Sequence, residues 1–176
     1  MAQKKPTYTS SSIAPVGIDF GKVPPQAIEL EEAVLGAIML EKDAILQVID
    51  ILKPESFYKD EHQKIFQAII DLSSGNKAVD LLTVTEELKK KKQLEEVGGP
   101  VYITQLTSRV ASAAHIEFHA RIVAQKHIQR ELIRVSSEIQ SKAFDESSDV
   151  DDLLDFSEAE LFNIAQGNIK KESQKV

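Results

Sequence analysis

Histidine is the residue type in this sequence best suited to metal binding or catalysis, because there are four histidines and no cysteine. His115 and His119 have the i, i+4 spacing that can hold zinc on one helix face. The residues between them give H-x-E-x-H, however, and not the H-E-x-x-H of metalloproteases. His62 has no second ligand at a suitable spacing. We therefore expect a surface pair at 115 and 119, a surface or capping histidine at 62, and no metal site.

A glycine-containing segment near the N-terminus is the one candidate for phosphate binding. Residues 17–23 read Gly-Ile-Asp-Phe-Gly-Lys-Val, with three residues between the glycines where a phosphate-binding loop has four. Val23 stands where Ser or Thr would hold magnesium, and no nucleophile motif such as G-x-S-x-G occurs. The sequence therefore predicts no catalytic residue and no cofactor or metal site of its own.

Composition narrows the class of protein further. The net charge is −7, and residues 145–160 contain eight acidic side chains and no Lys or Arg. Direct binding to nucleic acid is therefore not expected, because phosphate neutralisation needs clustered positive charge. No apolar run is long enough for a membrane span, and no apolar segment follows the N-terminal lysines as in a secretory signal. We expect a cytoplasmic protein.

The longest predicted element is a helix over residues 113–143, which contains neither Pro nor Gly. At 1.5 Å per residue it would be roughly 45 Å long, so it must project from a small domain or pack along a partner. Its apolar residues recur mainly at the helical period on one face: Phe118, Ile122, Ile128, Leu132, Val135, Ile139 and Ala143.

A second amphipathic helix is predicted over residues 150–166, capped by Ser148 or Asp149 and ended by Gly167. Leu154 and Leu161 belong to its apolar stripe. A short polar connection between two such helices is typical of an antiparallel hairpin. The second helix is strongly acidic while the first has a net charge of +2, so the pair is also electrostatically complementary.

Shorter helices are predicted before the hairpin, over residues 26–40, 43–52, 60–72 and 102–110. Gly36, in mid-helix, suggests the close approach of another helix. Residues 54–58 predict a turn that places Phe57 and Tyr58 in the core. Residues 79–85 could form a strand, but Thr83 and Glu86 fit a capping box that opens a helix to Lys92.

These elements predict an all-α fold, a small helical globule followed by an antiparallel helical hairpin. The expected division is a disordered tail (residues 1–22), a globular head (23–112), the hairpin (113–167) and the start of a linker (168–176). Apolar flanks on both hairpin helices indicate contacts with other protein chains.

Five colinear segments resemble the N-terminal domain of bacterial replicative DNA helicases of the DnaB family. Residues 23–37 resemble the opening of that domain, and four more segments follow in its order: 54–58 with 62–66, 79–85, 94–102 and 118–123. The resemblance covers about residues 23–167 and stops before the RecA-like motor, which would bind ATP and Mg²⁺. It leaves open whether this chain should be called an enzyme, because the ATP-dependent unwinding activity belongs to that motor.

The resemblance implies a collar that dimerises, reaches a hexamer in the full-length protein, and receives the C-terminal helicase-binding domain of primase in the replisome. A helicase loader is a further expected partner. By position, Tyr102, Ile133 and Ile139 match family residues tied to primase contact and its modulation, and Glu29, also expected at the partner contact, matches one near the head. Ile133 and Ile139 could equally be hairpin core, and Tyr102 a buried anchor.

We further expect a dimer or core face on the hairpin, made of Phe118, Ile122, Leu132, Val135, Leu154 and Leu161. Two alternative functions remain open: a helical DNA-binding module suggested by the basic residues of the long helix, and a purely structural dimerisation domain.

Overall fold

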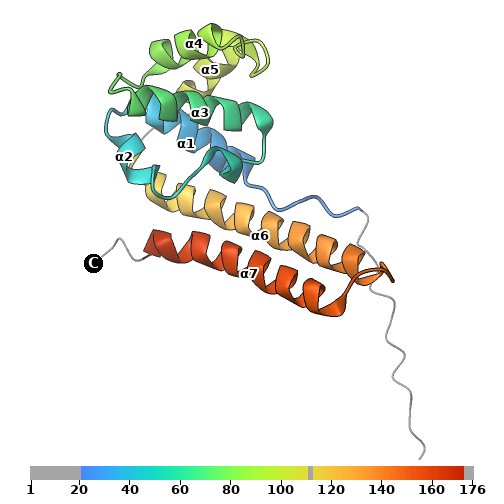
Figure 1. Ribbon diagram of the computed structural model, residues 1–176. Coiled ribbons are helices and arrows are strands. Elements are labelled where there is room, and N and C mark those ends of the chain that lie inside the picture. Colours follow the sequence, from blue (N-terminus) through green and yellow to red (C-terminus); the bar gives the residue numbers. More distant parts are fainter. Residues whose placement is uncertain (1–20, 111–112, 173–176) are drawn as a thin grey trace, which may run out of the picture.

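The computed structural model describes residues 21–110 and 113–172, and all the regular structure within these ranges is helical (Figure 1). The predicted all-α fold is thereby confirmed. Six elements form the head, and the last two helices pair as a hairpin beneath it. They are α1 (Ile28–Leu40), α2 (Ala44–Val48), the 3₁₀ turn η1 (Pro54–Ser56), α3 (Asp60–Ser74), α4 (Leu81–Lys90), α5 (Gly99–Ser108), α6 (Ile116–Ala143) and α7 (Val150–Glu172).

The head is organised around α1, which contacts α3, α5 and α6. Its apolar residues Val34, Leu35 and Ile38 are buried. Gly36 lies where α5 crosses: a Cβ at this position would overlap the carbonyl oxygen of Leu106. The close approach of another helix predicted for Gly36 is therefore confirmed, and only glycine fits there.

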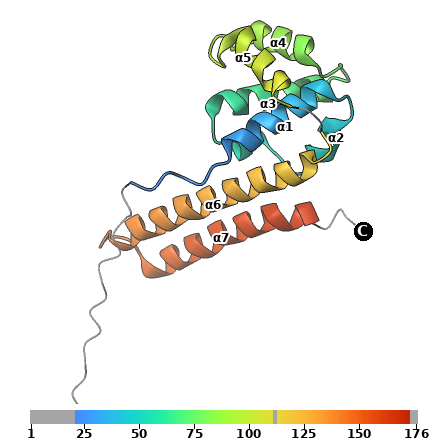
Figure 2. The same ribbon diagram turned by 180° about the vertical axis from the view of Figure 1, so that it is seen from behind.

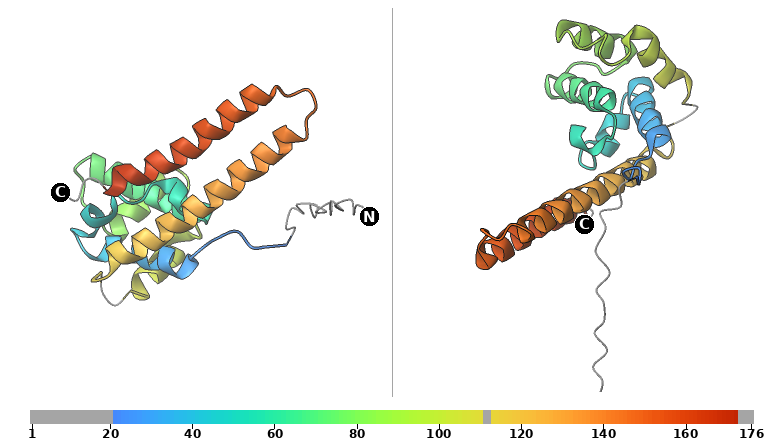
Figure 3. Two further views of the ribbon diagram at one scale, coloured as in Figure 1. Left: turned by 90° about the horizontal axis from the view of Figure 1, so that it is seen from below. Right: turned by 90° about the vertical axis from the view of Figure 1, so that its right-hand side faces the viewer.

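Helix α6 belongs to both parts of the molecule, as Figures 2 and 3 show. Its first turns pack under the head, where Ile116, Ala120, Val123 and Ala124 are buried. Beyond the head it continues with α7 alone, and the two helices run antiparallel as a layer of their own (Figure 3). Val135 is the one residue of this distal part that α6 buries.

Several predicted helix boundaries are wrong: the second helix is only Ala44–Val48, the fifth begins at Gly99, and the long helix begins at Ile116. Two further differences have a clear physical cause. The fourth helix begins at Leu81, because the Asp80 carboxylate accepts hydrogen bonds from the backbone N–H groups of Leu82 and Thr83, each 2.9 Å long. Asp80 is therefore the capping residue, and not Thr83 with Glu86. Helix α7 is capped by Asp149, as one of the two predicted options had it, but it continues through Gly167 to Glu172. One glycine costs a helix only about 1 kcal/mol, which its neighbours can offset.

The predicted disordered tail and most of the glycine segment 17–23 lie outside the described residues. Residues 21–27 lead into α1 without regular structure. No helix among the described residues is long and apolar enough to cross a membrane.

Candidate protein-interaction site

A row of polar side chains lies inside the head, at the meeting of α1, α3 and α5. The ring of His62 is fully buried, with Nδ1 2.7 Å from Glu31 Oε2 and Nε2 2.7 Å from the Tyr102 hydroxyl. Glu31 is only 1% exposed. The prediction of a surface or capping role for His62 is therefore wrong. Each ring nitrogen has a hydrogen-bonding partner, which is the condition for burying a polar group at low cost.

The signal for this row was present in the sequence. Glu31 precedes Val34, Leu35 and Ile38 at the spacings i+3, i+4 and i+7, and His62 stands in the same relation to Ile65, Phe66 and Ile69. Both polar residues thus fall on the buried face of their helix. Because single polar residues on such stripes are uncommon, two of them on helices that pack together predict a contact.

Tyr102 connects the row to the surface of the head. Its side chain is half-buried, and its hydroxyl lies 3.4 Å from Glu32 Oε1. Arg109 Nη1 donates to the other oxygen of Glu32 at 2.5 Å. Burial and the neighbouring Glu32 carboxylate raise the pKa of Tyr102 to about 12. The hydroxyl is therefore held in its neutral form, which suits an anchor that also donates a hydrogen bond.

Arg130 joins the hairpin to the head. From α6 its guanidinium donates to the carbonyl oxygens of Pro25 and Ser56, each at 2.8 Å, and lies 5.6 Å from the ring centre of Tyr58. Burial lowers the pKa of Arg130 from its ordinary value. Tyr58 is 37% exposed while Phe57 is 1% exposed, so the prediction that both aromatic side chains enter the core is wrong for Tyr58. Its ring covers Arg130 instead.

The hairpin presents large apolar side chains to solvent on both of its helices. Phe118 is 65% exposed, Leu154 58% and Leu161 47%. Leu132 is also exposed, whereas Ile122 is half-buried and Val135 is fully buried. The six residues predicted for a dimer or core face therefore divide: Val135 packs inside the hairpin, and four others face outward.

The four residues predicted for partner contact do not form one cluster. Glu29 is exposed in the first turn of α1, and Tyr102 is half-buried on α5, so both belong to the head. Ile133 is 53% exposed and Ile139 is half-buried on the part of α6 that extends beyond the head. Ile133 is free to meet another chain, while Tyr102 has the buried hydrogen bonds of an anchor.

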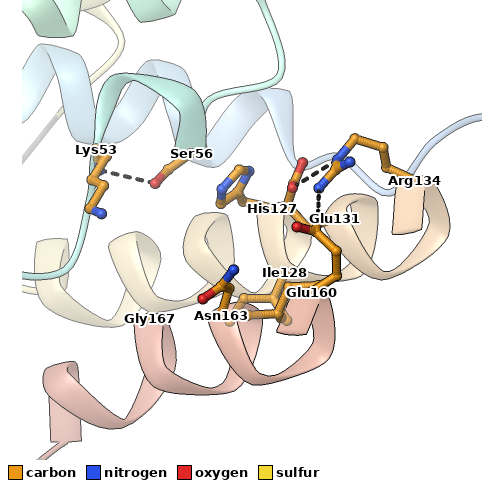
Figure 4. A pocket seen from close by; sticks show the side chains of 10 residues that line it. Lys53, Ser56, His127, Ile128, Glu131, Arg134, Glu160, Asn163 and Gly167 are labelled. Carbon is orange, nitrogen blue, oxygen red and sulfur yellow. Dashed lines mark hydrogen bonds and ion pairs between the residues drawn. The ribbon is translucent and has the colours of Figure 1, made fainter. Parts of the chain in front are cut away.

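A groove of about 360 Å³ opens between the head and the hairpin (Figure 4). Lys53 and Ser56 line it from the head, and residues of α6 and α7 line the opposite side. Arg134 lies at one end of the groove and binds three carboxylates at 3.0–3.2 Å, those of Glu131, Glu138 and Glu160. Its charge is therefore balanced within the hairpin, and this ion-pair network joins α6 to α7.

The predicted zinc-spaced pair is divided by the start of α6. His115 is the N-cap residue, and His119 lies one turn inside the helix. Within residues 21–110 and 113–172, no group of three or more His, Cys, Asp or Glu side chains is arranged to hold a metal ion. The features that remain as candidates for a functional role are the exposed apolar side chains of the hairpin, the polar row in the head and the contact of Arg130 with the head.

Comparison with known proteins agrees with this description. The family model described as "DnaB-like helicase N terminal domain" matches residues 23–125. The chain is 49% identical over 151 residues to a replicative DNA helicase DnaB of Rhodothermus marinus, and 41% identical over 145 residues to one of Geobacillus stearothermophilus. These alignments cover 86% and 82% of this chain, but only 16% and 32% of the relatives. The chain thus spans a third or less of these curated relatives.

Solved structures give the same fold. The N-terminal domain of DnaB helicase from Mycobacterium tuberculosis aligns with a TM-score of 0.76 at 35% identity, covering 80% of this chain and 99% of that one. A DnaB-like replicative helicase, described together with its interactions with primase, aligns with a TM-score of 0.67 at 26% identity. That alignment covers 80% of this chain and 31% of the helicase chain.

Proposed function

This chain belongs to the family of DnaB-like helicase N-terminal domains, and on that basis we propose that it is the non-catalytic collar of a replicative DNA helicase. In this role it assembles with copies of itself, up to a hexamer in the full-length protein, and docks primase in the cytoplasm at the replication fork. ATP and Mg²⁺ would bind a motor domain outside this chain. A helicase loader is a further partner in the same proposal.

The exposed apolar surface of the hairpin is the observation on which the proposal rests. Leu132 and Ile133 on α6, and Leu154, Leu161 and Phe162 on α7, are each at least 40% exposed. Large apolar side chains exposed on both helices of a hairpin favour a contact with another protein. The solved DnaB-like helicase described with its interactions with primase supports the choice of primase as one partner.

The ionic contacts of the hairpin weigh against the alternative of DNA binding. Arg121 is paired with Glu117, and Arg134 with three carboxylates. Arg130 is engaged with carbonyl oxygens of the head. Three of the arginines that suggested a basic face are therefore occupied within the chain, and counterion release from a duplex would gain little from them.

Calorimetric titration of this chain with the C-terminal domain of the primase from the same organism tests the docking role. We expect saturable binding at micromolar concentrations, weakened by Ile133→Ser and unaffected by Leu82→Ser, which changes an equally apolar residue that is 74% exposed on α4. No heat of binding at high micromolar concentrations, with an intact full-length hexamer also silent, would contradict the proposal. In a parallel anisotropy titration at low salt, tight and salt-sensitive DNA binding would favour the alternative module instead.

A further inference from the structure

The segment from Ser56 to Tyr58 is held from two sides at once. From the hairpin, Arg130 Nη2 donates to the Ser56 carbonyl oxygen at 2.8 Å. From the head, Glu31 Oε1 accepts the backbone N–H of Tyr58 at 2.7 Å, and Gln63 donates to the carbonyl of Phe57 at 2.9 Å. The segment therefore lies between the cation of α6 and the carboxylate of α1. The carbonyl that Arg130 binds and the N–H that Glu31 binds are two residues apart along the backbone.

The same carboxylate is the first member of the buried polar row. Glu31 Oε2 meets His62, and His62 meets the hydroxyl of Tyr102 on α5. Tyr102 in turn faces Glu32, which is bound by the exposed side chain of Arg109. A series of hydrogen bonds thus runs from Tyr102 on α5, through His62 and Glu31, to the backbone N–H of Tyr58. The backbone then continues to the Ser56 carbonyl that Arg130 binds.

The members of this row depend on one another because of where they lie. Glu31 is buried, so its carboxylate is stable only while both oxygens have donors. Its negative charge also favours the guanidinium of Arg130, which is partly removed from water. When the Tyr102 hydroxyl leaves His62, the imidazole can turn and Glu31 loses the donor that fixes its position. The Tyr58 N–H and the Ser56 carbonyl are then less firmly held.

We propose that the row from Tyr102 to Arg130 is a conformational relay, which couples the α5 surface of the head to the contact that fixes the head on the hairpin. Arg130 has two states: seated on the Pro25 and Ser56 carbonyls, or released to solvent with the head freer to move. A partner that engages Tyr102 shifts this equilibrium, and by linkage the seating of Arg130 changes the affinity for that partner. The proposal concerns this chain alone and is independent of the partner's identity.

Two readouts test the relay, and both use the full chain. Because the chain has no cysteine, Lys90→Cys on α4 and Ser141→Cys on α6, both exposed, allow a pair of spin labels that reports the distance between head and hairpin. Amide hydrogen exchange at Tyr58 reports the hydrogen bond to Glu31 directly. The variants are Tyr102→Phe, Arg130→Gln and Arg130→Lys. Thr104→Val is the matched control, because it removes from the same helix, α5, an exposed hydroxyl that bonds the Pro100 carbonyl and lies outside the row.

Tyr102→Phe should accelerate exchange at Tyr58 by roughly 5- to 10-fold, the effect of losing about one hydrogen bond. It should also broaden the label distance distribution in the same sense as Arg130→Gln, and the double variant should be no broader than Arg130→Gln alone. Thr104→Val should leave both readouts unchanged. If Arg130→Gln does not fold, Arg130→Lys takes its place, because lysine keeps the positive charge but lacks the two guanidinium nitrogens that bind the two carbonyls.

The relay is overturned if Tyr102→Phe leaves Tyr58 exchange and the distance distribution as in the unsubstituted chain. It is also overturned if neither Arg130 variant broadens the distribution, or if the effects of Tyr102→Phe and Arg130→Gln simply add. A broadening by Thr104→Val equal to that of Tyr102→Phe would likewise refute it, because the row would then have no special role.

Discussion

Gly36 and Leu106 meet without any side chain between them, the Cα of one helix facing the backbone carbonyl of another. This contact sets how closely α1 and α5 can pack, and with them the positions of Glu31, Glu32 and Tyr102. The polar row of the head therefore depends on an apolar feature of its core, the absence of one methyl group.

Gly36→Ala should destabilise the chain by about 1–3 kcal/mol, because the added methyl must push α5 away from α1. Urea unfolding followed by circular dichroism measures this. Gly167→Ala is the matched control, since a Cβ there meets nothing within 4 Å and the residue lies inside α7. It should be neutral or stabilise by up to about 1 kcal/mol. Equal effects of the two substitutions would contradict the close approach at Gly36.

The contact between His62 and Glu31 should show strong coupling in a double-mutant cycle. His62→Leu leaves a buried carboxylate without one donor and should cost about 3–5 kcal/mol. Adding Glu31→Met removes the stranded charge and should recover part of that loss, so the two effects are not additive. Chemical denaturation of the four proteins measures the coupling. Additive losses would mean that the two side chains do not interact in solution.

Tyr102 should ionise later than an ordinary tyrosine, with a pKa of about 12. The pKa of Tyr102 is higher in the folded chain than in the unfolded chain. The neutral hydroxyl therefore stabilises the fold fully below about pH 10, and this stabilisation is lost as the pH rises toward 12. The ultraviolet absorbance difference between the unsubstituted chain and Tyr102→Phe, recorded along a pH titration, isolates this ionisation. A transition in that difference near pH 10 would show that the hydroxyl is not buried in the row.

Charge placed on the outer face of the hairpin should abolish self-association without unfolding the chain. Leu161→Asp changes a residue that is 47% exposed on α7, so the fold loses little. Sedimentation over a concentration series should show the unsubstituted chain associating and the variant remaining monomeric. Leu82→Asp on α4 is the control for added charge. Association retained by Leu161→Asp would place the interface elsewhere.

Arg134→Ala should have a small effect despite its three carboxylate partners. Arg134 is 49% exposed, and ion pairs at such positions contribute about 0.2–1 kcal/mol each at most. We expect a total loss near 1 kcal/mol that shrinks in high salt. Thermal unfolding at two ionic strengths measures it. A loss that is large and independent of salt would mean that the network is effectively buried, as it would be inside an assembly.

The features predicted correctly from the sequence are those governed by local periodicity. The apolar spacing in α6 and the acidic, amphipathic α7 specify a hairpin because the helical period places those residues together wherever the chain folds. The crossing at Gly36 was predictable because a glycine in mid-helix lowers helix stability, and the close packing of a second backbone is what offsets that loss.

What the sequence did not reveal depends on contacts between distant elements. His62 and Glu31 are separated by 31 positions, and Arg130 reaches back 105 positions to Pro25. No local pattern encodes such pairs, although the buried-face position of His62 was a readable clue. The Tyr58 side chain lies at the surface because its ring packs against Arg130. Its exposure could not be predicted without knowing of that contact. The predicted end of α7 is wrong because Gly167 only weakens the helix and does not stop it.

Helix α6 passes without a break from beneath the head to the turn at its far end, and this continuity has a mechanical meaning. A rod of 28 residues is roughly 42 Å long. Arg130, which binds the Pro25 and Ser56 carbonyls, lies roughly 20 Å before the end of α6 at Ala143, so a tilt of about 5° at that contact moves the far end by roughly 2 Å. Small repacking near Pro25 and Ser56 would thereby move the far end of the hairpin, and in the proposed ring it would change the width of the central opening.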